Sequence, residues 1–546
     1  MPDYIPPPAK SHDAVVSNTK PALINYVAAI FAVADLPRAI GSFLFGYDSG
    51  IIGSVISKSY TEFHDYFNHP NDQITGAIVS VFAGGAFFGA LLAGYTADAM
   101  GRKRTIQLGS LIAVLGCTLQ TAAVTVPMLI VGRFVAGWSI GVLSMIVPMY
   151  QAEISPPHAR GLLSGWTQLM IGWGFFVANW VGYGCGFLKS TAQFRIPLGI
   201  QILPAVLLFG GMFVLPYSPR WLAKQGREEE AKATLIRLHG GAHNARHEVV
   251  EAEFAEMLTQ IEWERENLST NVLDLVKTKP NLHRTVCGCL VQAMCQWTGV
   301  NVGAYFGPTI YAALGFGGQT TLMINGISGA WGVLTTFVFI TFIDRPLTAT
   351  TWSSSAFLAL DRLGRRKPLI FGALAMSACL AWQSAIGKQF SVPGYTNFPL
   401  GVAGVASFFC FSWAFGWSYG PVSWIYQSEI FPMNIRAMGA AASTATNWLN
   451  NVIIAQITPY GLNALGWKYF MIFVCTNLTN ALVAFLLFPE TKNKTLEEIG
   501  LLFGDENVRV MPGYEGRVEG GEREKEGDEE KGGREMVEDV ERLDRV

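Results

Sequence analysis

Long apolar segments, separated by short polar ones, follow one another along most of this 546-residue chain. The hydrocarbon core of a bilayer is about 30 Å thick, so a helix that crosses it needs about 20 mostly apolar residues. About twelve segments meet this condition. The transmembrane helices that they predict are 24–56, 74–97, 105–125, 128–150, 162–186, 195–216, 284–312, 321–343, 367–388, 400–428, 437–461 and 467–488.

A hydrophilic stretch, 217–283, divides these segments into two sets of six. Its apolar residues recur at helical spacing between charged residues, which predicts helices outside the membrane. The chain is therefore expected to be an all-α integral membrane protein with two pseudo-symmetric six-helix bundles. The expected parts are an N-terminal segment 1–23, bundles 24–216 and 284–488, the linker 217–283, and a tail 489–546 whose Gly- and charge-rich end, 514–546, predicts disorder.

Composition favours the same class of protein. Only 15% of the residues are charged and the mean hydropathy is +0.30, whereas soluble domains carry roughly 25% charged residues. The sequence has no basic region with interleaved aromatic residues, which disfavours nucleic-acid binding. It also has no nucleophile–base pair, metal cluster or phosphate loop, so we expect neither an enzyme nor a metal or organic cofactor. The eight cysteines lie in or beside apolar segments and are interpreted as small buried residues.

Basic residues mark one side of the predicted bundle. They follow the second, fourth and eighth spans, at 102–104, Arg160 and 362–367. Loops rich in Lys and Arg stay in the cytoplasm according to the positive-inside rule. Both termini and the linker are therefore expected to be cytoplasmic.

Two motifs occur once in each half of the chain. Residues 98–103 (DAMGRK) match residues 361–366 (DRLGRR), and residues 153–160 (EISPPHAR) match residues 429–436 (EIFPMNIR). Each pair occupies corresponding loops in the two sets of spans. The repeat predicts two copies of one six-helix unit, related by an axis along the membrane normal.

Six further motifs occur in order on the predicted spans and loops. They are Gly132-Arg133-Phe134, PMYQAE at 148–153, SPRWL at 218–222, Gly299-Val300-Asn301, GPVSW at 420–424 and PETK at 489–492. With the repeats, they make residues 40–500 similar to the sugar porter family of major facilitators, in particular to fungal monosaccharide porters. The resemblance implies transport of a monosaccharide by alternating access, driven by the proton gradient, by a monomer surrounded by lipid in the plasma membrane.

The repeated acidic and basic residues are expected to form a gate network at the cytoplasmic helix junctions. Carboxylates and guanidinium groups there can form charge-assisted hydrogen bonds, with Arg102 and Arg104 pairing with Glu153 or lipid phosphates. The resemblance implies latches that hold the outward-open state and break when the cytoplasmic side opens. An alternative is that the bases only fix the topology. The expected network comprises Asp98, Arg102, Glu153, Arg160, Arg220, Asp361, Arg365, Glu429 and Arg436.

Ionisable residues inside membrane spans are rare and usually functional, and two of those in the predicted spans stand out. They are Asp48 and Arg133. The resemblance implies that this pair couples transport to protons, since passive carriers tend to have Asn at the position of Asp48. A neighbouring cation stabilises a charged carboxylate, while separation or desolvation favours protonation. The alternative is a static buried pair that holds two helices together.

Neutral amides and aromatic rings at membrane depth suit a sugar, whose hydroxyls donate and accept hydrogen bonds and whose C–H surface packs on a ring. Gln292, Gln296 and Asn301 are predicted to form one polar stripe along the seventh span. For a single amide, a helix–helix hydrogen bond is an equal alternative. The predicted substrate-binding residues, most of which match sugar contacts implied by the resemblance, are Gln168, Ile171, Gln292, Gln296, Asn301, Phe415, Trp424 and Asn451.

Several positions depart from the family pattern. Cys295 replaces a glutamine, Trp331 or Gly332 an asparagine, and Gly416 an acid. These changes leave a polyol, a quinate-like acid or a natural product open as the substrate. Tyr217 replaces the acid before the SPRWL motif, which is expected to weaken the network around Arg220.

A non-transporting sugar receptor that signals through its tail is a further alternative.

Two segments interrupt the pattern of spans. Residues 33–40 place Pro37 and charged neighbours in the first span, and residues 344–360 are inserted before Asp361. Proline inside a helix costs about 3 kcal/mol, and a charged residue at membrane depth costs roughly as much. The segments therefore predict either untranslated sequence read as coding or a copy with impaired activity.

Overall fold

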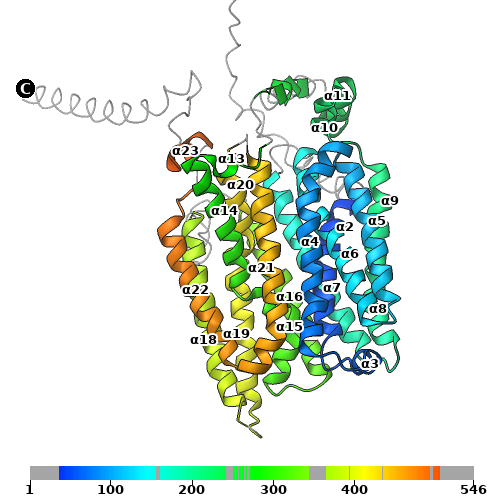
Figure 1. Cartoon of the computed structure of the whole chain (residues 1–546), viewed down its shortest axis with the longest axis vertical. Helices are drawn as coiled ribbons and strands as arrows, with labels where there is room; N and C mark the ends of the chain where they lie inside the picture. Colours follow the sequence, from blue (N-terminus) through cyan, green and yellow to red (C-terminus); the bar gives the residue numbers. More distant parts are fainter. Residues whose placement is uncertain are drawn as a thin grey trace, which may run out of the picture.

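The computed structural model describes residues 36–154, 160–240, 271–343, 364–392, 394–432, 435–491 and 496–504, together with scattered residues between 250 and 266. Within this part of the chain, every regular element is a helix. The helices form two groups that stand side by side, coloured blue to cyan and green to orange in Figure 1.

The first group contains the helices expected from the first six spans. They are α2 (Leu36–Val55), α4 (Asp72–Met100), α5 (Arg102–Thr121), α6 (Val126–Ile154), α7 (Arg160–Cys185), and α8 (Ala192–Ile200) with α9 (Ile202–Val214). The short helix α3 (Thr61–Tyr66) connects α2 to α4. The sixth span is thus built from two consecutive helices that meet at Gln201.

The second group repeats this arrangement. It contains α14 (Lys279–Trp297) with α15 (Val300–Ala313), α16 (Gln319–Ile343), α18 (Arg366–Phe390), α19 (Phe398–Gly416) with α20 (Tyr419–Ile430), α21 (Arg436–Leu465) and α22 (Lys468–Leu487). In the described part of the chain, seven stretches are long and apolar enough by themselves to cross a membrane. These seven include the two-part spans α8–α9 and α19–α20, and together with α2, α5, α7, α14–α15 and α21 they give the expected two-bundle fold.

The seventh span is broken where a continuous helix was predicted. Gly299 has φ +91°, a left-handed conformation that glycine adopts without steric cost, and it separates α14 from α15. Gln292 and Gln296 therefore lie on α14 and Asn301 on α15. The prediction of one polar stripe along a single helix is wrong.

The described part of the first span is the helix α2, which starts at Leu36, the first described residue of the chain. The 20 residues of α2 still suffice for a crossing. The expectation that residues 33–40 interrupt the first span stays a prediction, because residues 33–35 are not among those described. Residues 24–35, the insert 344–360, Asp361 and the tail segment 514–546 lie outside the described residues.

Short helices cover one end of the molecule. They are α10 (Pro219–Lys224), α11 (Glu228–Leu235), the π-helical turn η4 (Ile236–Gly240), α13 (Asp274–Lys277) and α23 (Leu496–Leu502), most of which are labelled at the top of Figure 1. Lys224 of α10 lies beside Asp98 at the same end. We call this the basic end, because residues 102–104 and 365–367 lie there, and the opposite one the α3 end.

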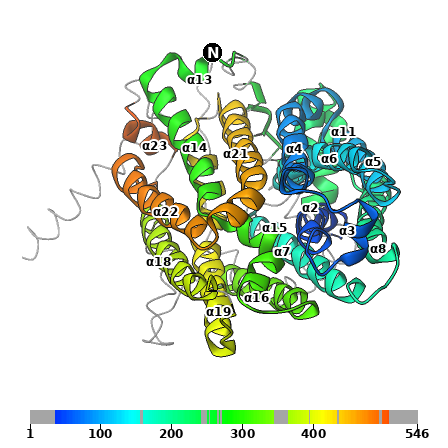
Figure 2. The same cartoon turned by 60° about the horizontal axis from the view of Figure 1, so that its bottom comes forward.

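The two halves meet along two pairs of long helices. Helix α4 packs against α21, and α7 packs against α16. Both views place α7 and α16 near the centre of the molecule, with α15 beside them in Figure 2. Each half has its own buried apolar clusters, and Trp448 and Tyr305 from the second half join those of the first. These packed seams leave a cavity between the halves.

Candidate functional site

One continuous cavity of about 1670 Å³ lies between the halves. Its lining includes amides from the middle of the bundle, such as Gln168 and Asn301, and charged residues of the basic end, such as Arg102 and Arg365. The cavity therefore runs from the centre of the molecule to the basic end.

Contacts between the halves close the α3 end. Ser59 donates a hydrogen bond to the Gly318 carbonyl at 2.9 Å, and its hydroxyl lies 3.3 Å from that of Thr321. Ser80 donates to Gln456 at 2.7 Å, which joins α4 to α21. A site at the centre of the molecule is thus separated from the α3 end and accessible from the basic end.

Seven of the eight residues predicted to bind substrate line this cavity. They come from α7, α14, α15, α19, α20 and α21, and are Gln168, Ile171, Gln296, Asn301, Phe415, Trp424 and Asn451. The amides are linked, since Asn301 donates to Gln296 and Gln296 donates to Asn447. Asn451 donates to the Tyr305 hydroxyl at 3.2 Å, and its Oδ1 accepts no hydrogen bond in the structure.

Gln292 is the exception. Its side chain is fully buried, donates to Gln427 at 2.8 Å and accepts from Asn447 at 2.8 Å, and it is not among the residues that line the cavity. Here the alternative interpretation holds, because the amide joins α14 to α20 and α21. Gln292 was predicted to contact the substrate. In the structure it instead holds Asn447, which lines the cavity.

Many cavity residues were missed from the sequence, and three of them bear on the polar part of the site. They are Tyr305, Asn447 and Trp448. Asn447 lies one helical turn before Asn451 on α21, a spacing that could have identified it. Trp448 is 5% exposed and its indole Nε1 has no hydrogen-bond partner. The Asn451 Oδ1 acceptor and the Trp448 Nε1 donor are thus both without a partner, on residues that line the cavity.

The membrane ion pair forms as predicted. Arg133 Nη1 lies 3.1 Å from Asp48 Oδ1, and both side chains are 1% exposed. Arg133 also donates to the Ile78 carbonyl at 3.2 Å and its guanidinium lies 4.3 Å from the Phe82 ring. Neither member of the pair lines the cavity, although the neighbouring Ser49 does.

Glycine positions the helix that carries Asp48. A Cβ atom at Gly46 would lie 2.0 Å from the Ile171 carbonyl oxygen, so only glycine lets α2 approach α7 this closely. The FGYDSG sequence at 45–50 therefore fixes Asp48 within the first half by backbone contact. It also brings α2 beside Ile171, which lines the cavity.

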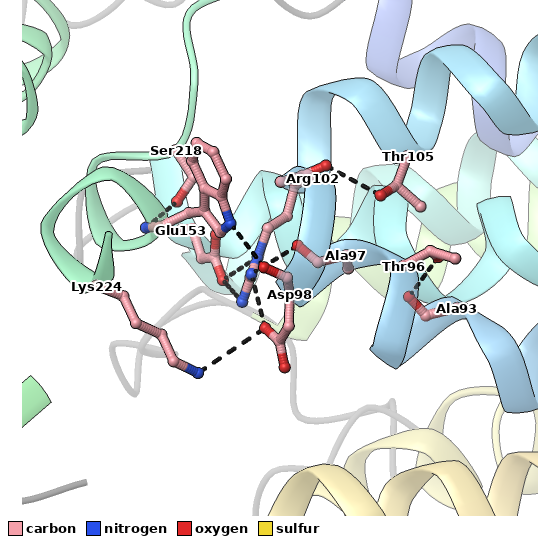
Figure 3. Close-up of polar contacts among 11 residues, drawn as sticks. Ala93, Thr96, Ala97, Asp98, Arg102, Thr105, Glu153, Ser218 and Lys224 are labelled. Carbon is pink, nitrogen blue, oxygen red and sulfur yellow. Dashed lines mark hydrogen bonds and ion pairs between the residues drawn. The ribbon is translucent and has the colours of Figure 1, made fainter. Parts of the chain in front are cut away.

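Three of the predicted gate residues of the first half, Asp98, Arg102 and Glu153, form one network at the basic end, shown in Figure 3. Arg102 lies 3.0 Å from both the Asp98 and the Glu153 carboxylates, and Lys224 lies 3.9 Å from Asp98. Trp221 donates its indole N–H to the Asp98 carbonyl at 3.1 Å. This network ties α10 to the junction between α4 and α5.

The second half has a corresponding network. Arg365 Nη2 lies 3.1 Å from Glu429 Oε1, and Thr491 donates to Glu429 Oε2 at 2.8 Å. Arg436 donates to the Phe431 carbonyl at 3.1 Å. Arg220 and Arg436 both line the cavity. The Arg160 side chain and all of Asp361 lie outside the described residues.

Two of the expected latches are formed in this structure. The cavity reaches the basic end, and Arg102–Glu153 and Arg365–Glu429 are both paired. Each pair joins two residues of the same half. That these pairs open together with the cytoplasmic side stays a prediction.

The two halves of the molecule also share contacts made by residues for which no role was predicted. Lys103 donates to the Leu215 carbonyl at 2.6 Å and Arg366, its counterpart, donates to the Phe485 carbonyl, so each caps the end of the last helix of its half. Tyr150 and Tyr426 donate to the carbonyls of Pro216 and Pro489 at 2.6 and 3.4 Å. The shared Tyr-Gln-x-Glu pattern before Glu153 and Glu429 was the available signal.

The residues that depart from the family pattern differ in whether they line the cavity. Cys295 is buried away from the cavity, with its Sγ 3.9 Å from the Tyr419 carbonyl oxygen. Trp331 stacks on Phe409 and donates to its carbonyl at 3.0 Å, whereas Gly332 and Gly416 line the cavity.

Tyr217 takes part in the basic-end network. It stacks on Trp221 and accepts a hydrogen bond from Arg104 at 3.1 Å. Arg104 was expected to pair with Glu153 or lipid; its partner in the structure is Tyr217.

Known proteins support the family suggested by the motifs. Residues 35–346 and 347–503 match the family described as "Sugar (and other) transporter". The MFS-type transporter criB of Aspergillus cristatus is 35% identical over 469 residues, covering 85% of this chain and 92% of that protein. The high-affinity glucose transporter of Kluyveromyces lactis is 33% identical over 487 residues, covering 85% and 84%.

Solved structures show the same fold. The MFS proton:xylose symporter XylE bound to 6-bromo-6-deoxy-D-glucose aligns with a TM-score of 0.68 at 24% identity, over 86% of this chain and 98% of that one. The inward open conformation of XylE from E. coli aligns with a TM-score of 0.66 at 23% identity, over 86% and 98%. This chain is a multi-pass membrane transporter, not an enzyme, and belongs to the sugar porter family of the major facilitator superfamily.

Proposed function

We propose that the chain carries a monosaccharide across the plasma membrane by alternating access, in symport with a proton. The observation that carries this proposal is a cavity lined by neutral amides and aromatic rings beside a buried Asp48–Arg133 pair. Relatives named as glucose transporters support a sugar substrate, and XylE, named as a proton:xylose symporter, supports coupling.

The cavity offers the chemistry that a sugar needs. Gln168, Asn301 and Asn451 supply groups that both donate and accept hydrogen bonds. Trp448 Nε1 and Asn451 Oδ1 are a buried donor and a buried acceptor without partners. Burying such a group destabilises the protein unless a ligand or a water molecule forms a hydrogen bond with it. The Trp424 ring provides a surface for the C–H groups of a pyranose.

Proton coupling would use the buried carboxylate. Beside Arg133 the Asp48 carboxylate is stabilised in its charged form, and loss of that contact would favour protonation. Arg133 has other partners, the Ile78 carbonyl and the Phe82 ring, that can hold it while Asp48 is neutral. Protonation can then favour one arrangement of the helices over another.

The basic end is proposed to face the cytoplasm, following the positive-inside rule. The cavity would then be accessible from the cytoplasm while the contacts between Ser59 and Gly318 close the outer side. In this arrangement the structure corresponds to an inward-facing state of a monomer. The outward-facing state requires these contacts to break and the basic end to close.

Uptake measurements test the proposal. The full chain is expressed in yeast cells that lack hexose transport, and uptake of labelled glucose, xylose, fructose and polyols is measured with and without a proton uncoupler. We expect at least one monosaccharide to accumulate above its external concentration, and the uncoupler to abolish the accumulation. Absence of uptake of every monosaccharide would contradict sugar transport. Uptake that never exceeds equilibrium and is insensitive to the uncoupler would contradict symport alone.

A further inference from the structure

The cavity has a wall that offers a ligand little beyond apolar contact. Gly332 on α16 and Gly416 on α19 both line it and have no side chains. A Cβ atom at Gly332 would meet no atom within 4 Å, and one at Gly416 would lie 3.6 Å from Thr335 Oγ1. The two glycines therefore leave open space beside the polar part of the cavity.

The hydroxyls next to this space are already engaged. Thr335 and Thr336 each donate to the Gly332 carbonyl at 2.9 Å. Phe411, Phe415 and Trp417 of the same region line the cavity with aromatic surface, and Ser412 adds one hydroxyl. We call Gly332, Thr335, Phe415 and Gly416 the glycine recess.

A second feature points to a ligand in the same cavity. Trp448 and Asn451 are 5% and 4% exposed, line the cavity, and carry a donor and an acceptor without partners. They come from α21, whereas the recess comes from α16 and α19. A ligand that satisfies both surfaces is polar on one side and apolar on the other.

We propose that the preferred substrate is a sugar that bears an apolar substituent, such as an aryl or alkyl glycoside, and that the substituent occupies the glycine recess. This inference rests on the proposed sugar transport and specifies its substrate class. An unsubstituted hexose has hydroxyls on all sides, and those facing the recess would lose their water without gaining equivalent partners. An aryl group there would instead gain by leaving water.

Direct binding tests the preference. Trp417, Trp424 and Trp448 line the cavity, so the intrinsic fluorescence of the purified full-length protein reports occupancy. Phenyl β-D-glucoside is titrated beside methyl β-D-glucoside and glucose. Burial of a phenyl ring is expected to lower the dissociation constant about ten- to hundredfold relative to the methyl glucoside. Equal or weaker binding of the phenyl glucoside would overturn the proposal.

Filling the recess locates the substituent. Gly332→Leu and Gly416→Leu are expected to remove most of the preference for phenyl glucoside while glucose binding changes less than about threefold. Gly210→Leu is the matched control, because Gly210 on α9 also has no atom within 4 Å of a Cβ and lies outside the cavity lining. Gly332→Ala, a smaller change, replaces any leucine variant that does not fold. Equal weakening of both ligands would contradict the recess as the site.

The failures of the two proposals are distinguishable. Glucose uptake without a preference for phenyl glucoside would refute this inference and leave monosaccharide transport standing. Tight phenyl glucoside binding that depends on Gly332, with no uptake of any unsubstituted sugar, would support the recess and refute transport of plain monosaccharides.

Discussion

Glu490 caps the amino end of α18: the backbone N–H of Arg365 lies 2.7 Å from its Oε1, and that of Arg366 lies 3.0 Å from its Oε2. The first N–H groups of a helix have no partners within it and carry partial positive charge, so a carboxylate there is favourable. Thr491, the next residue, donates to Glu429. The segment after the last span therefore holds the basic-end network of the second half together.

Replacing Glu490 with Gln should destabilise this end. The amide keeps one acceptor oxygen and loses the charge, so the loss expected is about 1–2 kcal/mol of stability. Thermal unfolding of the purified protein in detergent measures it. Glu229→Gln, at an exposed position in α11, is the control. An unchanged melting temperature for Glu490→Gln would show that the cap contributes no stability.

Asp48→Asn should separate coupling from translocation. The amide cannot take up and release the proton, so we expect accumulation against a gradient to disappear while exchange of labelled sugar across the membrane continues. Arg133 keeps its contacts to the Ile78 carbonyl and Phe82, which should preserve folding. Asp65→Asn, on the exposed α3, should behave like the unmodified chain. Undiminished accumulation in Asp48→Asn would refute the coupling role.

Cross-linking the α3 end should trap the cavity open toward the basic end. The hydroxyls of Ser59 and Thr321 lie 3.3 Å apart across the two halves, which is close enough for a disulfide after Ser59→Cys and Thr321→Cys. The background should lack the exposed Cys410 and Cys475. Oxidation is expected to stop transport and reduction to restore it, with no effect on either single-cysteine chain. Full transport in the cross-linked protein would show that these residues need not separate.

Two glutamines should respond differently to leucine. Gln292→Leu leaves Gln427 and Asn447 with lost partners, so we expect about 1–3 kcal/mol less stability. Gln168 lines the cavity, and Gln168→Leu should raise the KM for sugar about tenfold with a smaller effect on stability. Thermal unfolding and initial uptake rates separate the two effects. A raised KM with unchanged stability in Gln292→Leu would show that Gln292 contacts the substrate.

Sequence was sufficient for the fold because its signals are local. The apolar length of each segment, the bases that follow it and the repeated motifs at 98–103 and 361–366 together predict twelve spans in two halves. Asp48 and Arg133 stood out as ionisable residues inside predicted spans, and the resemblance to sugar porters implied that they pair. Seven of the eight predicted substrate residues line the cavity, because neutral amides are uncommon at membrane depth.

Tertiary packing determined which polar side chains line the cavity, because that depends on residues distant in the chain. Gln292 and Gln296 lie one turn apart on α14, yet only Gln296 lines the cavity, because Asn447 and Gln427 of other helices cover Gln292. The left-handed Gly299 redirects Asn301 through backbone geometry that residue spacing does not specify. The Arg102–Glu153 and Arg365–Glu429 pairs each form within one half of the molecule.

The chain by itself thus determined that this is a two-bundle sugar porter, since hydrophobic length, charge and motif order are properties of the sequence. Only the tertiary structure decided which polar groups face the cavity, which end is open and where the glycine recess lies. Those features depend on contacts such as Ser59 with Gly318 and Glu490 with Arg365, which join residues more than a hundred positions apart.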